Sequence, residues 1–357
     1  MLRILRVVRA RWATVTGHAA LFPSPRWLSI GARLGLLAGL AVGSVTVRPG
    51  DAPADDGTRR IRVAFSSTVD LGDLPSLMAH ALLATQGYEV VPTFFAHAQL
   101  AADALARGQM DVGNGSTRTY WAAIAKGADV ATIMEQVGNG WAIMAATEIR
   151  TCADLHGRPF AVSGEGSVSA ALSRAYIASR CPGTEPRVMS IPGSEHRAAA
   201  LLAGRLQAAP VELAESVYLA ARAPGRFRTL VSFAEELPSV VTTGVHVNRS
   251  WATRNPRAVQ DYLKALLTIH RQIRAEHGLL VAEARARLRI DPAVLADVVE
   301  AHFRTNAWDA NGRLTPAVVR DSVAFFVGAA SLLPGVTPER VADLSHLERT
   351  LDEIGRR

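Results

Sequence analysis

The stretch of residues 100–130, LAADALARGQMDVGNGSTRTYWAAIAKGADV, decides the fold. Its apolar residues recur at helical spacing until Gly108, which predicts a small-residue helix followed by a very short strand. The run Asn114, Gly115, Ser116, Thr117 then opens a second helix. A strand that leads through such a turn into a helix leaves backbone N–H groups unpaired. They can hold a small polar or anionic molecule, or the run can simply cap the helix.

Strands and helices alternate on both sides of this stretch. Expected strands cover residues 60–65, 88–95, 130–136, 141–147, 158–162, 187–191, 208–212, 227–233 and 242–248, with helices between most of them. This order predicts an α/β fold with a mostly parallel sheet and helices on both faces. From residue 255 onward we expect helices almost throughout, starting at Pro256, Pro292, Pro316 and Pro338.

A short internal repeat divides the chain into two blocks. Ala104-Leu105-x-x-Gly108 reappears as Ala200-Leu201-x-x-Gly204, 96 positions later, and each copy lies in its own strand–helix block. Two such blocks predict two lobes that face each other. Ligands of open α/β sheets bind at the carboxyl ends of strands, so loops of both lobes can close on one cleft.

Residues 1–54 have the composition of a targeting segment. They hold seven arginines and one acidic residue, and residues 34–47 form an uncharged apolar run of 14 residues. That length suits a signal-peptide core, with cleavage expected before Asp55; a retained membrane anchor is the alternative. Either reading places residues 55–357 outside the cytoplasmic membrane, in the periplasm or its equivalent. That part carries a net charge near +1, which argues against nucleic acid as a partner.

The two cysteines, Cys152 and Cys181, lie 29 positions apart. An oxidising compartment permits a disulfide between them, although spacing alone does not establish one. Without a nearby pair of histidines they make a poor metal site, and we expect neither a metal nor a cofactor.

Several ordered motifs resemble one family, the periplasmic substrate-binding proteins of ABC importers that carry nitrate, sulfonates, taurine and pyrimidine precursors of thiamine. The similar segments are Ala104-Leu105-x-x-Gly108-x-x-Asp111-Val112-Gly113, residues 123–130, Asp154-Leu155-x-Gly157-Arg158, Ala161-Val162-Ser163-x-x-Gly166-Ser167, Arg197-x-x-Ala200-Leu201-x-x-Gly204 and Trp251-x-x-x-Asn255-Pro256. Their order and spacing agree over about residues 60–275.

The resemblance implies a type II, two-lobe Venus-flytrap fold with a helical C-terminal region. The first lobe would comprise residues 58–143 and 246–357, and the second residues 149–241. Crossings near residues 145–150 and 240–245 would form the hinge about which the lobes close on a ligand.

Candidate ligand-binding residues come from both lobes. Ser66, Ser67 and Thr68 follow the first strand and can either donate hydrogen bonds to a ligand or form a capped turn. The family position favours ligand contact for residues 114–117 and for Gly166 and Ser167, which open a helix. Glu212 can accept from a donor group of the ligand, and Trp141 is either a wall of the cleft or part of the core.

These features favour a monomeric solute-binding protein that delivers a small molecule to an ABC permease in the membrane. The candidate ligands are a sulfonate, a taurine-like zwitterion, nitrate and a pyrimidine, and Glu212 favours one with a donor group over nitrate. The alternatives are a membrane-anchored ligand sensor and an enzyme on the same fold. No nucleophile–base order or metal spacing stands out in the sequence, so we expect no catalytic activity.

Overall fold

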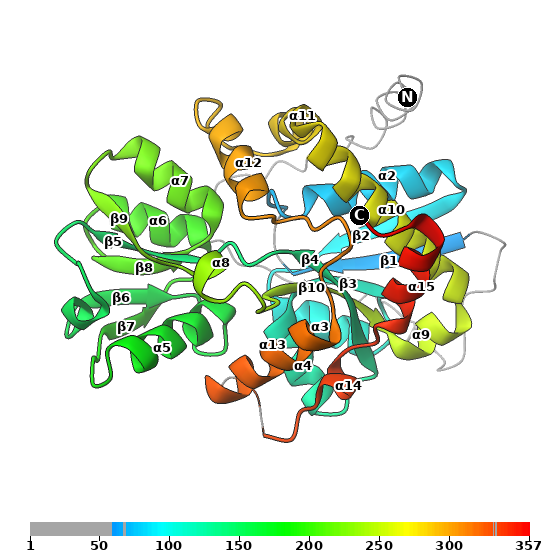
Figure 1. Ribbon diagram of the computed structural model, residues 1–357, viewed down its shortest axis with the longest axis horizontal. Coiled ribbons are helices and arrows are strands. Elements are labelled where there is room, and N and C mark those ends of the chain that lie inside the picture. The colour runs from blue at the N-terminus through cyan, green and yellow to red at the C-terminus, as the bar shows by residue number, and fades with distance from the viewer. Residues whose placement is uncertain (1–58, 67–68, 331, 333) are drawn as a thin grey trace, which may run out of the picture. The chain divides into compact units, whose positions relative to one another are not determined.

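Two five-stranded sheets organise the chain. The computed structural model describes residues 59–66, 69–330, 332 and 334–357, and the expected leader at 1–54 lies outside them. The first sheet has the order β2-β1-β3-β10-β4 and the second the order β7-β6-β8-β5-β9. Figure 1 shows the second sheet at the left and the first sheet to its right, each with its own helices.

The first sheet is mixed rather than mostly parallel. It contains β1 (Arg59–Phe65), β2 (Tyr88–Phe94), β3 (Val112–Ser116), β4 (Val130–Val137) and β10 (Thr243–Asn248). β1 runs parallel to β2 and β3, but β10 returns from the second sheet and pairs antiparallel to both β3 and β4. Its helices are α2 (Leu74–Thr85), α3 (Ala98–Ala106) and α4 (Thr117–Ala125).

The second sheet has the same construction. Its strands are β5 (Ala142–Ala146), β6 (Pro159–Val162), β7 (Arg187–Ser190), β8 (Ala208–Val211) and β9 (Phe227–Ser232). β5 pairs antiparallel to β8 and β9, as β10 does in the first sheet. The helices are the short η2 (Cys152–Leu155), α5 (Val168–Arg180), α6 (Ser194–Leu202), α7 (Leu213–Arg222) and α8 (Phe233–Glu236).

The chain passes from the first sheet to the second earlier than the expected crossing at residues 145–150. β5 already belongs to the second sheet, so this passage falls between Val137 and Ala142. Ala142–Ala146 pairs on both sides within the second sheet, so the connection between the two sheets lies before it. The chain returns between Ser232 and Thr243.

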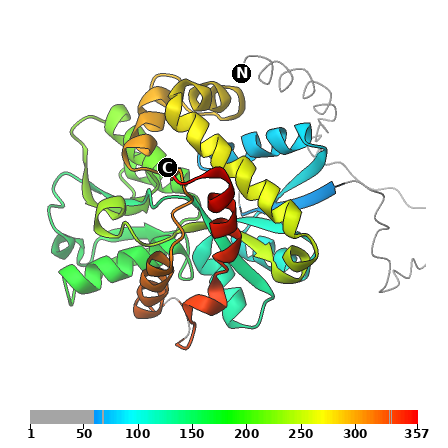
Figure 2. The same cartoon turned by 45° about the vertical axis from the view of Figure 1, so that its right-hand side comes forward.

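The C-terminal region is helical, as expected. It contains α9 (Arg249–Arg254), α10 (Pro256–Ala275), α11 (His277–Arg287), α12 (Leu295–Arg304), α13 (Pro316–Gly328), α14 (Pro338–Val341) and α15 (Ser345–Ile354). α10 and α15 lie side by side in both views (Figures 1 and 2). Among the described residues, no helix combines the length and apolarity that a membrane span requires.

Two helix boundaries in this region differ from expectation. Pro292 does not begin a helix, because a turn in which Asp291 O accepts from the N–H of Val294 and Leu295 precedes α12. The helix expected over residues 338–354 is broken in two, because the N–H of Asp343 bonds to the carbonyl oxygen of Thr132 on β4 at 2.9 Å.

A disulfide joins Cys152 of η2 to Cys181 at the end of α5. Replacing both cysteines with alanine should lower the free energy of unfolding by about 3 kcal/mol, because the bond closes a loop of 29 positions in the unfolded chain. Chemical denaturation of the oxidised wild type and of the double variant measures this difference. A reductant should weaken the wild type and leave the variant unchanged; equal stability of the oxidised wild type and the variant would contradict the prediction.

Candidate functional site

The run of residues 114–117 is not the turn that the sequence indicated. β3 continues through Ser116, because Asn114, Gly115 and Ser116 pair antiparallel with Val245, Gly244 and Thr243 of β10. Thr117 begins α4 directly, and its N–H donates to the carbonyl oxygen of Thr242 at 3.0 Å. The side chains of Asn114 and Thr117 are buried, so Gly115 and the half-buried Ser116 present the accessible part of this run.

Ser66 lies directly against this strand end. Its hydroxyl donates to the carbonyl oxygen of Asn114 at 3.1 Å. Gly115 has φ +144°, and a Cβ placed on it would lie 2.0 Å from Ser66 Oγ. Only glycine therefore fits at position 115 while Ser66 keeps its place. Ser67 and Thr68 lie outside the described residues.

The loop before α5 brings Gly166 and Ser167 to the second sheet's strand ends. Ser167 caps α5: its Oγ accepts from Ala170 N at 3.2 Å and donates to Gly164 O at 2.6 Å. A Cβ on Gly166 would lie 2.8 Å from Nη1 of Arg118, a residue of α4. The helix that follows β3 therefore reaches the loop of the second lobe at Gly166.

Arg197 of α6 holds the strand ends of the second sheet together. It is fully buried; its Nε donates to Pro210 O at 2.7 Å, and its Nη1 to Ser163 Oγ at 2.7 Å. Nη1 also reaches the carbonyl oxygens of Ile191 and Gly193. Within the described part of the chain, Nη2 has no hydrogen-bond partner. The guanidinium lies 5.6 Å from the ring centre of the partly buried Trp141, which contacts a site residue while packing against the core.

Glu212 belongs to a group of carboxylates that both lobes supply. We define this interlobe acidic group as Asp70 and Asp73, which lie before α2, together with Glu195, Glu212 and Glu215, which lie at the N-terminal ends of α6 and α7. Each helix follows a strand of its sheet, so the members gather at strand ends. Asp73 is buried, Glu212 and Glu215 are half-buried, and Asp70 and Glu195 are exposed.

Within each lobe, hydrogen bonds hold members of the interlobe acidic group in place. In the first lobe the N–H of Asp73 donates to Asp70 Oδ1 at 3.2 Å, the N–H of Asp70 donates to Asp73 Oδ2 at 3.3 Å, and Gln136 Nε2 donates to Asp73 Oδ1 at 2.8 Å. In the second lobe the N–H of Glu212 donates to Ser194 Oγ at 2.8 Å. Asp73 therefore bonds to Asp70 and Gln136 instead of capping α2 with its side chain.

The carboxylates of the two lobes repel one another. Desolvation, followed by the charges of Asp70 and Glu215, raises the pKa of Glu212 well above its ordinary value, and Arg197 opposes the rise. Desolvation and then the charge of Asp70 likewise raise the pKa of Asp73. Concentrating negative charge in this way costs stability that a bound molecule can restore.

Glu212→Gln should raise the Tm of the unliganded protein at pH 8 and change it much less at pH 5. The folded-state pKa of Glu212 is raised, so the folded protein loses stability as the pH rises above the ordinary value of 4.5. A gain of about 1 kcal/mol would appear as roughly 2 °C in Tm. Glu339→Gln removes a carboxylate at an exposed position and is the matched control in the same thermal denaturation experiment. A Tm for Glu212→Gln at or below that of the wild type at pH 8 would count against repulsion.

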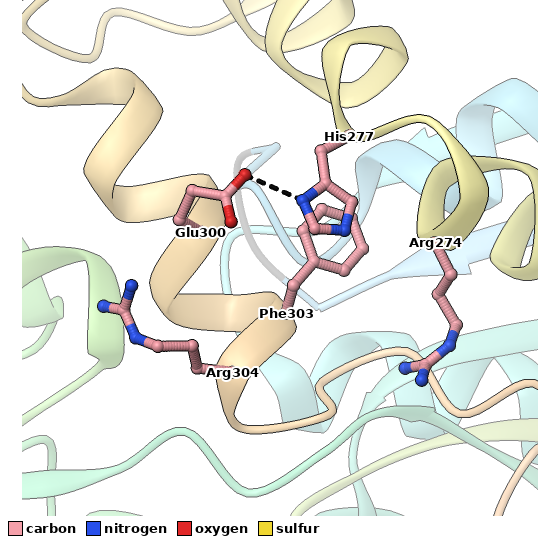
Figure 3. A pocket seen from close by; sticks show the side chains of 5 residues that line it. All are labelled: Arg274, His277, Glu300, Phe303 and Arg304. Atoms are coloured by element: carbon pink, nitrogen blue, oxygen red, sulfur yellow. Dashed lines mark hydrogen bonds and ion pairs between the residues drawn. The ribbon is translucent and has the colours of Figure 1, made fainter.

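A cavity between α10, α11 and α12 contains none of the candidate site residues described above. About 230 Å³ in volume, it is lined by Arg274, His277, Glu300, Phe303 and Arg304 (Figure 3). His277 Nδ1 lies 2.7 Å from Glu300 Oε1, and the His277 ring stacks on Phe303 with centroids 3.7 Å apart. Because this histidine and this carboxylate already bind each other, we place the candidate site at the strand ends instead.

Comparison with protein-family models gives a match that covers more than half of the chain. The model of the family described as NMT1/THI5 like matches residues 84–269. The chain belongs to the NMT1/THI5-like family. The matched range of this NMT1/THI5-like protein contains Gly115, Gly166, Arg197 and Glu212. No curated protein matches the chain.

Solved structures with the same fold include three binding proteins. The alkanesulfonate-binding protein SsuA from Xanthomonas axonopodis pv. citri has a TM-score of 0.62 at 19% identity, and the alignment covers 79% of this chain and 96% of that one. The periplasmic aliphatic sulphonate binding protein SsuA from Escherichia coli gives 0.64 at 18%, with 80% and 93% covered. The nitrate-binding protein NrtA from Synechocystis PCC 6803 gives 0.65 at 13%, with 84% and 89% covered. The NMT1/THI5-like chain therefore has the two-lobe α/β fold of periplasmic binding proteins, as expected.

Sequence reasoning did not include Asp70, Asp73, Gln136, Glu215 or Arg197 among the candidate site residues of this NMT1/THI5-like protein. The acidic residues had a signal: Asp70-x-x-Asp73 and Glu212-x-x-Glu215 have the same spacing, and each pair follows a strand directly or after a short loop. Gln136 had none, because the role of an amide inside a strand depends on its tertiary neighbours. Arg197 stood in a family-like motif, but its partners are set by tertiary structure.

Proposed function

We propose that this chain is the solute-binding protein of an ABC import system and captures a small organic molecule between its two lobes. Membership in the NMT1/THI5-like family supports this proposal. The named neighbours support it further, since their titles describe sulfonate- and nitrate-binding proteins. Closure of the lobes, rather than bond chemistry, would be the working step.

One observation carries the proposal at the level of residues. Segments of the two sheets meet at their strand ends: Arg118 of α4 lies against Gly166, and the charge of Asp70 acts on Glu212. A solute held there would contact both halves of the chain at once. We therefore propose a first lobe built on the first sheet with the C-terminal helices, and a second lobe of about residues 142–232. The connections at 138–141 and 233–242 would be the hinge.

The proposed site combines three parts. Ser66, Gly115 and Ser116 would contact the solute from the first lobe, Gly166 and Glu212 from the second, and Trp141 from the connection between them. Arg197 would position the strand ends of the second lobe, since its own donors are mostly used by the protein. Export of a monomeric protein to the periplasm and delivery to a membrane permease complete the proposal.

A thermal-shift screen of small sulfonates, amines, zwitterions, nitrate and pyrimidines tests this function. A compound at 100 times its Kd should add about 2.7 kcal/mol to the stability of the folded state. We expect at least one compound to raise the Tm and to be recovered chemically unchanged. A compound that the protein converts to product would instead support an enzyme, and a screen without any shift would contradict the proposal.

A further inference from the structure

We propose that the solute captured between the lobes carries a positively charged group, such as a protonated amine, and that the interlobe acidic group binds it. This inference rests on the proposed function and deepens it by naming the chemistry of the solute. It differs from the chemistry that the neighbours' titles name, since sulfonate and nitrate are anions.

The first support is the arrangement of the carboxylates. Asp70 and Asp73 come from the first lobe, and Glu195, Glu212 and Glu215 come from the second. Among the residues that the structure describes, two basic groups face them: Arg197, whose charge lowers the pKa of Glu212, and the exposed His196, whose Nδ1 lies 3.6 Å from Glu195 Oε1. The carboxyl groups outnumber the basic groups, so a cation between the lobes would favour their ionised forms and attract both halves.

The second support is the buried side-chain amide of Gln136, whose oxygen lacks a hydrogen-bond donor in the described part of the chain. Gln136 is only 2% exposed, and its Nε2 donates to Asp73 Oδ1 at 2.8 Å. The Oε1 atom of the same amide has no hydrogen-bond partner among the residues that the structure describes. A buried acceptor without a donor is destabilising, and here it lies beside the carboxylate of Asp73. A ligand with several N–H donors would satisfy the amide and the carboxylate together.

The group is better suited to an organic cation than to a metal ion. Across the described ranges, no three His, Cys, Asp or Glu side chains are placed to hold a metal. The carboxylates are spread over two lobes, and Asp70 is exposed while Glu212 and Glu215 are half-buried, so a solute can reach them. Carboxylates from both lobes suit a molecule that contacts the two lobes together.

A charge-matched series of three-carbon compounds tests the inference. Propylammonium, propanediamine and aminopropane sulfonate carry a cationic group, whereas propane sulfonate does not. We expect at least one cation-bearing compound to raise the Tm of the full chain at pH 8 by several degrees, and propane sulfonate to have no effect. Glu212→Gln and Asp70→Asn should each weaken that compound's binding at least tenfold in calorimetry, whereas Glu339→Gln, on the exposed face of α14, should not.

The outcomes separate this inference from the proposed function. Stabilisation by propane sulfonate alone, by nitrate, or by an uncharged pyrimidine would overturn the cationic ligand and leave the solute-binding function standing. The absence of any shift with the cation-bearing compounds would also overturn it. Unaltered binding of a cation-bearing compound by Glu212→Gln and Asp70→Asn would show that the acidic group is not its site.

Discussion

Gly115→Ala is expected to lower the free energy of unfolding by about 4 kcal/mol and to remove the Tm shift that a bound solute produces. Gly115 has φ +144°, where a side chain costs roughly 1–3 kcal/mol. The added Cβ would also lie 2.0 Å from Ser66 Oγ and 2.6 Å from Ser66 Cβ. Separating β1 from β3 to relieve this contact adds about 1–3 kcal/mol more.

Gly108→Ala provides the matched control, because it introduces the same methyl group without the contact. Gly108 also has a positive φ, +69°, but a Cβ there meets nothing within 4 Å. Its cost should be about 1–2 kcal/mol, from backbone strain alone. Urea denaturation of both variants measures the difference. Equal losses for the two variants would mean that the approach of Ser66 to Gly115 has no structural importance.

Arg197→Met should lower the free energy of unfolding by about 4–6 kcal/mol. The change removes the guanidinium donor from four acceptors: the carbonyl oxygens of Pro210, Ile191 and Gly193, and Ser163 Oγ. Of these, the Gly193 oxygen keeps a bond from the backbone N–H of residue 197. An unsatisfied buried polar group costs about 1–3 kcal/mol, and relaxation recovers part of the total. The change also removes the positive charge that lowers the pKa of Glu212.

Two further variants separate the charge of Arg197 from its geometry. Arg197→Lys keeps the charge but cannot reach all four acceptors, so it should lose less stability than Arg197→Met and still fall below the wild type. Arg205→Met, at an exposed position, should change stability by less than about 0.5 kcal/mol. Calorimetric unfolding of the three variants and of the wild type measures these differences in stability. A loss for Arg197→Met no larger than that of Arg205→Met would refute the role assigned to this arginine.

Local patterns predicted the fold well because most of its elements are locally determined. Alternating strands, glycine stops and proline starts indicated nearly every element, and the repeated Ala-Leu-x-x-Gly helix indicated two blocks. The path of the first sheet was harder to predict, because β10 pairs between β3 and β4 only after the chain has returned from the second sheet. That pairing extends β3 through Gly115 and Ser116, which local preference places in a turn.

The candidate site was predictable only in part. Glu212 and Gly166 could be selected from their positions after strands, yet their partners are distant in sequence. Asp70 acts on Glu212 and Arg118 reaches Gly166 only because the two sheets come together. The charge of a site is a sum over such partners, so composition near any one motif could not reveal that carboxylates predominate.

The most direct test of lobe closure is the distance between spin labels on the two lobes, measured by pulsed electron paramagnetic resonance. Gln99→Cys on α3 and Arg222→Cys at the end of α7 provide exposed attachment sites, one on each lobe. Saturation with a compound that raises the Tm should shift the distance distribution and narrow it. An unchanged distribution at saturation would contradict the claim that this protein works by closing its lobes around a solute.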